Sequence, residues 1–164
     1  MKKAVWSGII AAAGVLALST SVYAQTTATV TVNATVAAKA KLTVTQTAIS
    51  FADQDPDLVT QIAANTPVDI TVKARGAGGP VTLTVAAAGN LVDGANSINI
   101  SALKWTSTDT SFSATGTSST SPVTVMSFNG SGNRTGSQNY TLDNSWNYVT
   151  GSYGTTLTYT LAVP

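Results

Sequence analysis

The strongest constraint on the fold is a period-two alternation of apolar and hydroxyl-bearing side chains. It is clearest in residues 28–36, where Val30, Val32, Ala34 and Val36 alternate with Thr29, Thr31, Asn33 and Thr35. Successive side chains of a β-strand point to opposite faces, so this spacing places one set on each face. The segment is therefore predicted to be a strand with one buried and one solvated face.

The same alternation recurs along the chain, with turn signals between the segments. The predicted strands lie within residues 42–45, 49–51, 68–73, 81–85, 98–100, 123–128, 138–142 and 155–163. Gly78-Gly79-Pro80 and Asp93-Gly94 are typical of turns. No stretch has helical periodicity, and residues 107–121 and 129–137, rich in Ser, Thr, Gly and Asn, are predicted to be loops. This pattern predicts an all-β fold, an immunoglobulin-like (pilin-like) two-sheet β-sandwich.

The composition agrees with this fold class and excludes several kinds of chemistry. β-branched Thr and Val suit a pleated, half-buried surface. The chain has no histidine and no cysteine, so hydrolysis by a histidine-containing triad, His/Cys zinc sites and thiol chemistry are excluded. We expect no cofactor and no enzymatic activity.

The N-terminus has the layout of a secretory signal peptide. Lys2 and Lys3 precede an apolar run over residues 4–18, and Val22-Tyr23-Ala24 supplies small residues before a cleavage site. The apolar run is shorter than the roughly 20 residues of a membrane span; an uncleaved anchor is the alternative. We expect a signal peptide over residues 1–24 and an exported bacterial domain over residues 25–164 without a membrane span. The periplasm, the cell surface and the medium remain open as its location.

The charge of the exported part argues against nucleic acid as a partner. Without Lys2 and Lys3, six of the eight basic residues remain against seven aspartates, which gives a net charge near −1. A protein that binds phosphate backbones needs a basic patch, and the sequence predicts none.

Both ends of residues 25–164 resemble a known family. The alternating segments within residues 29–45, the triplet Ile49-Ser50-Phe51 and the acidic turn over residues 53–57 are similar to spore coat protein U domains. Such domains also form the subunits of archaic chaperone–usher pili. The ending, residues 151–161, is similar to the Gly-x-Tyr ending of many secreted pilin-like domains. The family usually carries a cysteine near residues 38–41, and this chain has none.

The resemblance implies a structural subunit of a pilus, fibre or surface coat that assembles by strand addition. Residues 27–37 would then leave their own domain and fill a groove of a neighbouring subunit, with Val30, Val32, Ala34 and Val36 as assembly residues. A sandwich that lacks a strand exposes an apolar groove and unpaired backbone. An alternating peptide fills the groove with its apolar side chains and pairs with the backbone. The implied partners are a second copy or a related subunit, and a periplasmic chaperone and usher. The alternative is that residues 25–38 form the first strand of their own sandwich.

Two further groups of residues have a functional and a structural interpretation. Asp53, Asp55 and Asp57 have a spacing at which three carboxylates can converge on calcium, but the favoured interpretation is an acidic surface turn broken by Pro56. The aromatic residues can form a sugar-stacking surface or pack within the sandwich; they are Trp105, Tyr140, Trp146, Tyr148 and Tyr153. Trp146 and Tyr153 are expected to cover one end of the core. The alternative function is a monomeric secreted binding module for carbohydrate or a surface protein.

Overall fold

The computed structural model describes residues 27–76 and 78–164, so the predicted signal peptide lies outside the described residues. The chain divides into two units, one up to Ala34 and the other Thr35–Pro164. Among the described residues no helix is long and apolar enough to cross a membrane. The strands of the second unit are β1 (Lys39–Val44), β2 (Gln61–Ala63), β3 (Val68–Arg75), β4 (Pro80–Ala87), β5 (Leu91–Asp93), β6 (Asn96–Ile98), β7 (Leu103–Thr106), β8 (Thr115–Thr117), β9 (Val123–Asn129), β10 (Gly132–Asp143) and β11 (Leu157–Ala162).

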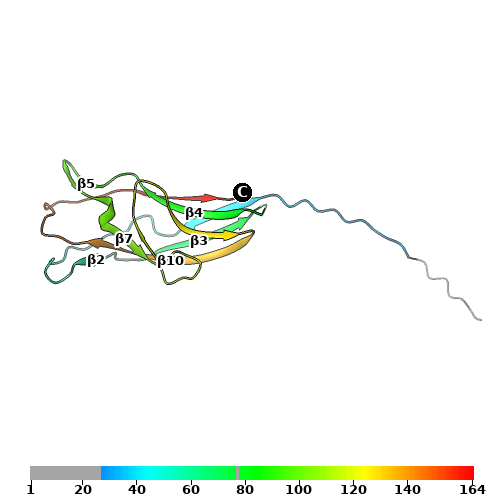
Figure 1. Ribbon diagram of the computed structural model, residues 1–164, viewed down its shortest axis with the longest axis horizontal. Coiled ribbons are helices and arrows are strands. Elements are labelled where there is room, and N and C mark those ends of the chain that lie inside the picture. Colours follow the sequence, from blue (N-terminus) through cyan, green and yellow to red (C-terminus); the bar gives the residue numbers. More distant parts are fainter. Residues whose placement is uncertain (1–26, 77) are drawn as a thin grey trace, which may run out of the picture. The chain divides into compact units, whose positions relative to one another are not determined.

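The strands form two principal antiparallel sheets and a small hairpin (Figure 1). The larger sheet has the order β1-β3-β10-β7-β8, and β2 pairs with the C-terminal part of β10. The smaller sheet has the order β11-β4-β9, and β5 pairs with β6. In β9 a register shift beside Leu83 lets the successive residues Val125 and Met126 both be buried, as expected for a β-bulge.

The core lies between the inward faces of the two principal sheets. Val68, Ile70, Val72 and Ala74 of β3 belong to the same buried cluster as Val81, Leu83, Val85 and Ala87 of β4. Both strands alternate in burial along their length, which is the pattern that the sequence predicted. The all-β fold class is confirmed, and the architecture is that of a β-sandwich.

Several details differ from the sequence-based expectations. The predicted loop over residues 129–137 is largely strand, because β10 begins at Gly132 and pairs with residues 68–74 of β3. Its small and polar residues pair through their backbones, which a rule based on side-chain pattern does not detect. β2, β5, β7 and β8 were not predicted. Of the predicted strand over residues 98–100 only Ile98 belongs to a strand, because Ile100–Ala102 form a short 3-10 helix, η1, and Ile49 and Phe51 lie in an irregular segment.

The predicted strand over residues 28–36 is absent from the single chain. Residues 27–38 belong to no helix or strand, and their side chains are exposed. Val30 and Val32 of the first unit retain 86% and 85% of their accessible surface. Whether this segment joins a sheet of its own chain or of another subunit stays a prediction.

Candidate functional site

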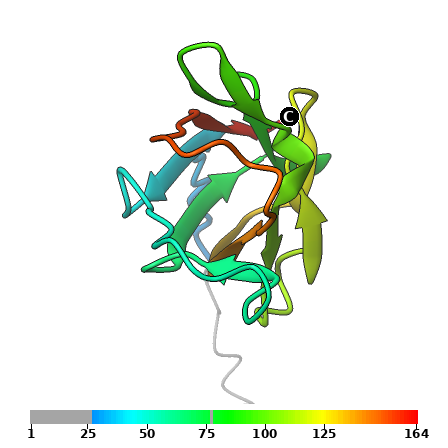
Figure 2. The same cartoon turned by 90° about the vertical axis from the view of Figure 1, so that its left-hand side faces the viewer.

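The candidate site is a groove lined by residues of two edge strands, β1 of the larger sheet and β11 of the smaller sheet. Figure 2 shows these two strands at the same side of the sandwich. β1 pairs with β3 on one side, and β11 pairs with β4 on one side. Within the described part of the chain, neither strand pairs with another strand along its second edge. Both edges therefore present backbone N–H and C=O groups that are free to pair with an added strand.

The groove has a volume of about 590 Å³ and an apolar floor. Leu42 and Val44 of β1 and Leu157 of β11 line it. They pack against the core yet stay only half-buried, whereas their counterparts on β3 and β4 are fully buried. The segment after β1 adds Ile49, and β3 adds Val68. This arrangement leaves apolar surface of the core open along the groove.

A buried polar network lies beneath the β11 side of the groove. The Tyr159 hydroxyl, from β11, donates to Oε1 of Gln138 at 2.6 Å, and the Tyr140 and Tyr159 hydroxyls lie 2.8 Å apart. Gln138 and Tyr140 are buried on β10, so the network joins the two sheets across the core. The Nε2 atom of Gln138 has no hydrogen-bond partner among the described residues.

Burial perturbs the acidity of both tyrosines. Desolvation raises the pKa of Tyr159 to about 12, although the hydrogen bond with Tyr140 acts in the opposite direction. Desolvation also raises the pKa of Tyr140, and the charge and hydrogen bond of Tyr159 add to this effect. Both hydroxyls are therefore neutral at physiological pH and act as hydrogen-bonding groups.

The three aspartates proposed as calcium ligands are not brought together. No group of three or more carboxylates placed to hold a metal exists within residues 27–76 and 78–164. Oδ1 of Asp55 accepts from the backbone N–H of Asp57 at 2.9 Å, and Oδ1 of Asp57 accepts from the Trp146 indole at 3.0 Å. The carboxylates of Asp55 and Asp57 thus hold a surface turn.

The aromatic residues are divided between core and surface. Trp105 and Tyr140 are buried. Trp105 packs over Gly116 of β8, where an added Cβ would clash with the ring. Tyr153 packs partly against the core, but Trp146 is 68% exposed. The prediction that Trp146 covers one end of the core is therefore wrong, because its loop presents the ring to solvent.

Comparison of the chain with family models, with curated proteins and with solved structures gives no match. The structure itself supplies what the sequence could not, namely which strands form the groove. Sequence analysis predicted only that residues 42–45 and 155–163 lie in strands. The Gln138 network was missed, because a glutamine in a Ser/Thr-rich segment gives no signal of burial.

Proposed function

We propose that the protein is a structural subunit of an exported bacterial pilus, fibre or surface coat, and that it assembles by strand addition. One copy places residues 28–36 in the groove between β1 and β11 of a neighbouring copy or a related subunit. The sandwich is then an immunoglobulin-like domain that a partner completes. The observation that carries this proposal is an open apolar groove in a chain that also bears an exposed alternating strand-forming segment.

The spacing of the two elements supports the match. The exposed segment has four apolar residues on one face: Val30, Val32, Ala34 and Val36. The last strand region has four side chains that pack against the core: Leu157, Tyr159, Leu161 and Val163. Alternate residues of a strand are about 6.6 Å apart, so the two sets repeat with the same interval. An added strand would cover the half-buried floor and pair the free backbone of β11.

The chemistry of the chain favours assembly over catalysis. The sequence has no histidine or cysteine, and the groove is lined mainly by aliphatic and threonine side chains. We propose no cofactor for this site. A periplasmic chaperone and usher are the partners we propose for export, because an unfilled groove of this kind aggregates unless it is covered.

Truncation tests the proposal directly. Residues 25–164 should form oligomers on size-exclusion chromatography, and residues 38–164 should be monomeric but folded, because the second unit has its own core. A synthetic peptide of residues 27–38 should bind the truncated protein and raise its melting temperature by mass action. A protein that is monomeric with and without the segment, and that ignores the peptide, would contradict the proposal.

The runner-up function is a monomeric secreted binding module, and the exposed Trp146 is the observation that favours it. An exposed indole fixed by the carboxylate of Asp57 is a surface on which a sugar ring can stack. Under this alternative residues 25–164 stay monomeric, and soluble oligosaccharides quench Trp146 fluorescence. Tryptophan fluorescence that is insensitive to sugars, together with oligomers, would favour strand addition.

A further inference from the structure

Most charged residues of the sandwich are separated along its long axis; the exceptions are Asp69 and Asp109, which both hydrogen-bond to Ser137 within β10. The proximal end is defined here as the end where β1 begins and β11 ends; it includes the turn at Gly79 and the residue Pro164, whose side chain lies against that glycine. Five basic residues lie on the strands that meet there: Lys39, Lys41, Lys73, Arg75 and Arg134. Lys39 faces Arg75 and Lys41 faces Lys73 across β1 and β3. No acidic side chain forms a salt bridge with any of the five within the described chain.

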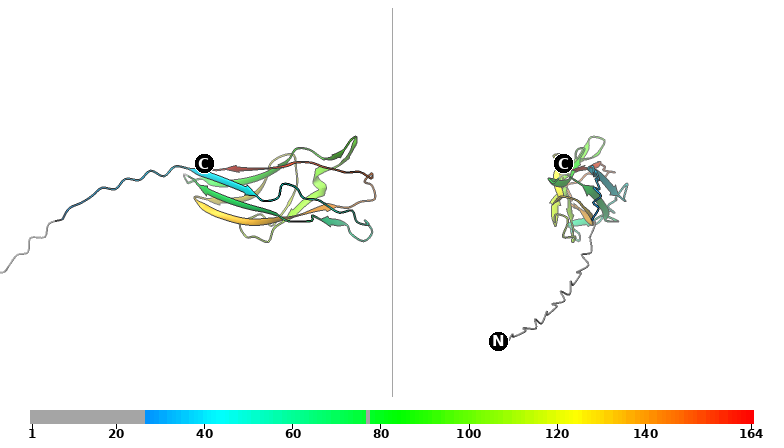
Figure 3. Two further views of the ribbon diagram at one scale, coloured as in Figure 1. Left: turned by 180° about the vertical axis from the view of Figure 1, so that it is seen from behind. Right: turned by 90° about the vertical axis from the view of Figure 1, so that its right-hand side faces the viewer.

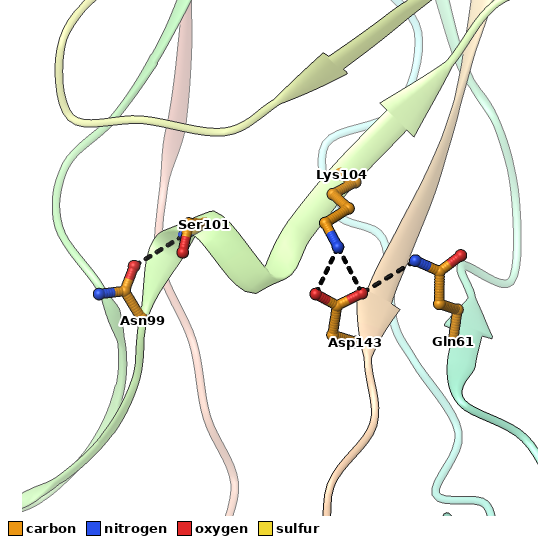
Figure 4. A network of polar contacts seen from close by, with 5 residues as sticks. All are labelled: Gln61, Asn99, Ser101, Lys104 and Asp143. Carbon is orange, nitrogen blue, oxygen red and sulfur yellow. Dashed lines mark hydrogen bonds and ion pairs between the residues drawn. The ribbon is translucent and has the colours of Figure 1, made fainter.

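The distal end, which is the opposite end of the sandwich, is acidic. It consists of residues 52–60, the β5–β6 hairpin and residues 143–154, which are joined by hydrogen bonds of Asn144 to Gln54 and Val59. It carries Asp53, Asp55, Asp57, Asp93 and Asp143. Lys104 is its one basic residue in the described chain, and Nζ of Lys104 lies 2.6 Å from the Asp143 carboxylate (Figure 4). The other four aspartates form no salt bridge with any described residue.

We propose that the acidic distal end of one copy docks on the basic proximal end of the next, as a second interface between copies. This inference rests on the proposed function and adds a second interface and a polarity to it. The occupant is a second copy of this chain, because the two ends of one molecule are complementary in charge. Opposite ends that meet in this way form a heterologous contact, which propagates into a filament instead of closing.

The strand directions allow the same arrangement. β11 runs toward the proximal end, and the strands extend lengthwise between the two ends (Figure 3). A segment that pairs antiparallel with β11, the slightly more stable geometry, runs toward the distal end of the acceptor. Its own domain continues at Lys39, which is proximal, so the proximal end of one copy faces the distal end of the other. The reverse direction would place two basic ends together, which is unfavourable.

Exposed apolar side chains accompany the acidic residues at the distal end. Leu58 is 82% exposed and Trp146 is 68% exposed, and the indole of Trp146 donates to Asp57 of the loop that carries Leu58. A contact between copies would cover these side chains, and the aspartates around them would select the basic end as the partner.

Charge reversal at each end tests the inference in residues 25–164. The distal variant carries Asp53→Lys and Asp57→Lys, the proximal variant carries Lys39→Asp and Lys73→Asp, and a third protein carries all four substitutions. Light scattering should show assembly about tenfold slower or more for each two-site variant, and near-normal assembly for the four-site protein. Assembly of the unaltered protein should slow by a similar factor when salt rises from about 20 mM to about 500 mM.

The outcome separates this inference from the proposed function. The peptide of residues 27–38 is uncharged, so in excess it should block assembly of every variant equally if strand addition operates. Peptide inhibition with no salt dependence, and with no loss and rescue on charge reversal, would overturn the end-to-end contact alone. Assembly that the peptide does not inhibit would overturn strand addition itself. The melting temperature of the monomer controls for damage to the fold.

Discussion

Residues 28–36 and β11 have nearly the same sequence pattern and different structures. In both, apolar residues alternate with threonine, but β11 pairs with β4 and packs half of its side chains on the core. The earlier segment forms no strand among the described residues, and its valines are exposed. The difference shows that alternation determines the two faces of a strand but not the sheet that the strand joins.

The largest effect should come from placing a charge on the apolar face of the exposed segment. Val32→Asp should leave the monomer's unfolding free energy unchanged, because Val32 is exposed in the single chain. In the proposed assembly the carboxylate would be buried in an apolar groove without a partner. Such a charge costs about 3–5 kcal/mol, which corresponds to at least a hundredfold weaker association. Size-exclusion chromatography over a concentration series measures this loss.

Thr31→Asp is the matched control for that substitution. Thr31 lies next to Val32 on the opposite face of the expected strand, so its side chain should remain in water after assembly. We expect less than about a tenfold change in association. Equal losses for the two variants would contradict the assignment of faces.

Leucine-to-alanine substitutions should cost the monomer more unfolding free energy in the core than in the groove. Leu83 of β4 is fully buried, so Leu83→Ala should lower the unfolding free energy of the monomer by about 2–5 kcal/mol. Leu157 of β11 lines the groove and is half-buried, so the same change should cost the monomer only about 1 kcal/mol. Bound peptide 27–38 should increase the cost of Leu157→Ala and leave that of Leu83→Ala unchanged. Urea unfolding with and without peptide measures both.

The core strands were predictable because their side-chain alternation and their turn residues both agree with their positions in the sheets. β3, β4 and β11 have clear alternation, and a turn with Gly94 at a φ of 58° was marked by Asp93-Gly94. β10 was underestimated because Gly132 and Gly136 contribute little side-chain pattern. Its pairing is set by the neighbouring strands β3 and β7, which is information from the tertiary structure.

The site was predictable only in part, because a groove is a relation between strands that are distant in sequence. The sequence identified the alternating segment and predicted strands in the regions of β1 and β11, but not that both are edge strands. The buried position of Gln138 depends on the approach of Tyr159 from the other sheet. Charge separation between the two ends was likewise hidden, because Lys39 and Arg75 become neighbours only through β1–β3 pairing.

The ionisation of Tyr159 at alkaline pH should report whether the groove is empty or filled. Its pKa is about 12 in the folded chain, against about 10 in the unfolded chain. Above pH 10 the unfolded chain releases a proton that the folded chain retains. Stability from this group is therefore complete below pH 10, and falls by about 1.4 kcal/mol per pH unit until pH 12. Tyr140, whose pKa is also raised, adds to the fall.

Tyrosinate absorbance and urea unfolding between pH 8 and pH 12 measure this effect. Tyr159→Phe should flatten the pH dependence. Bound peptide 27–38 should delay ionisation of the unaltered protein, because a filled groove keeps water from the β11 side of the network. Ionisation that is unaffected by a peptide shown to bind would place the peptide elsewhere on the sandwich, and would break the proposed pairing of the segment with β11.

The smallest effect should come from a polar pair that belongs to neither alternating region. Desolvation alone would raise the pKa of Asp143, but hydrogen bonds from Lys104 and Gln61 and the charge of Lys104 lower it (Figure 4). The pair is about one-third exposed, so Lys104→Met should change the unfolding free energy by less than about 1 kcal/mol at neutral pH. This contribution should disappear as the pH falls below about 4, because protonation of Asp143 removes the pair from the unaltered protein, which then no longer differs from the variant. A larger loss would mean that β7–β10 pairing depends on this contact more than on the buried Trp105 and Tyr140 beside it.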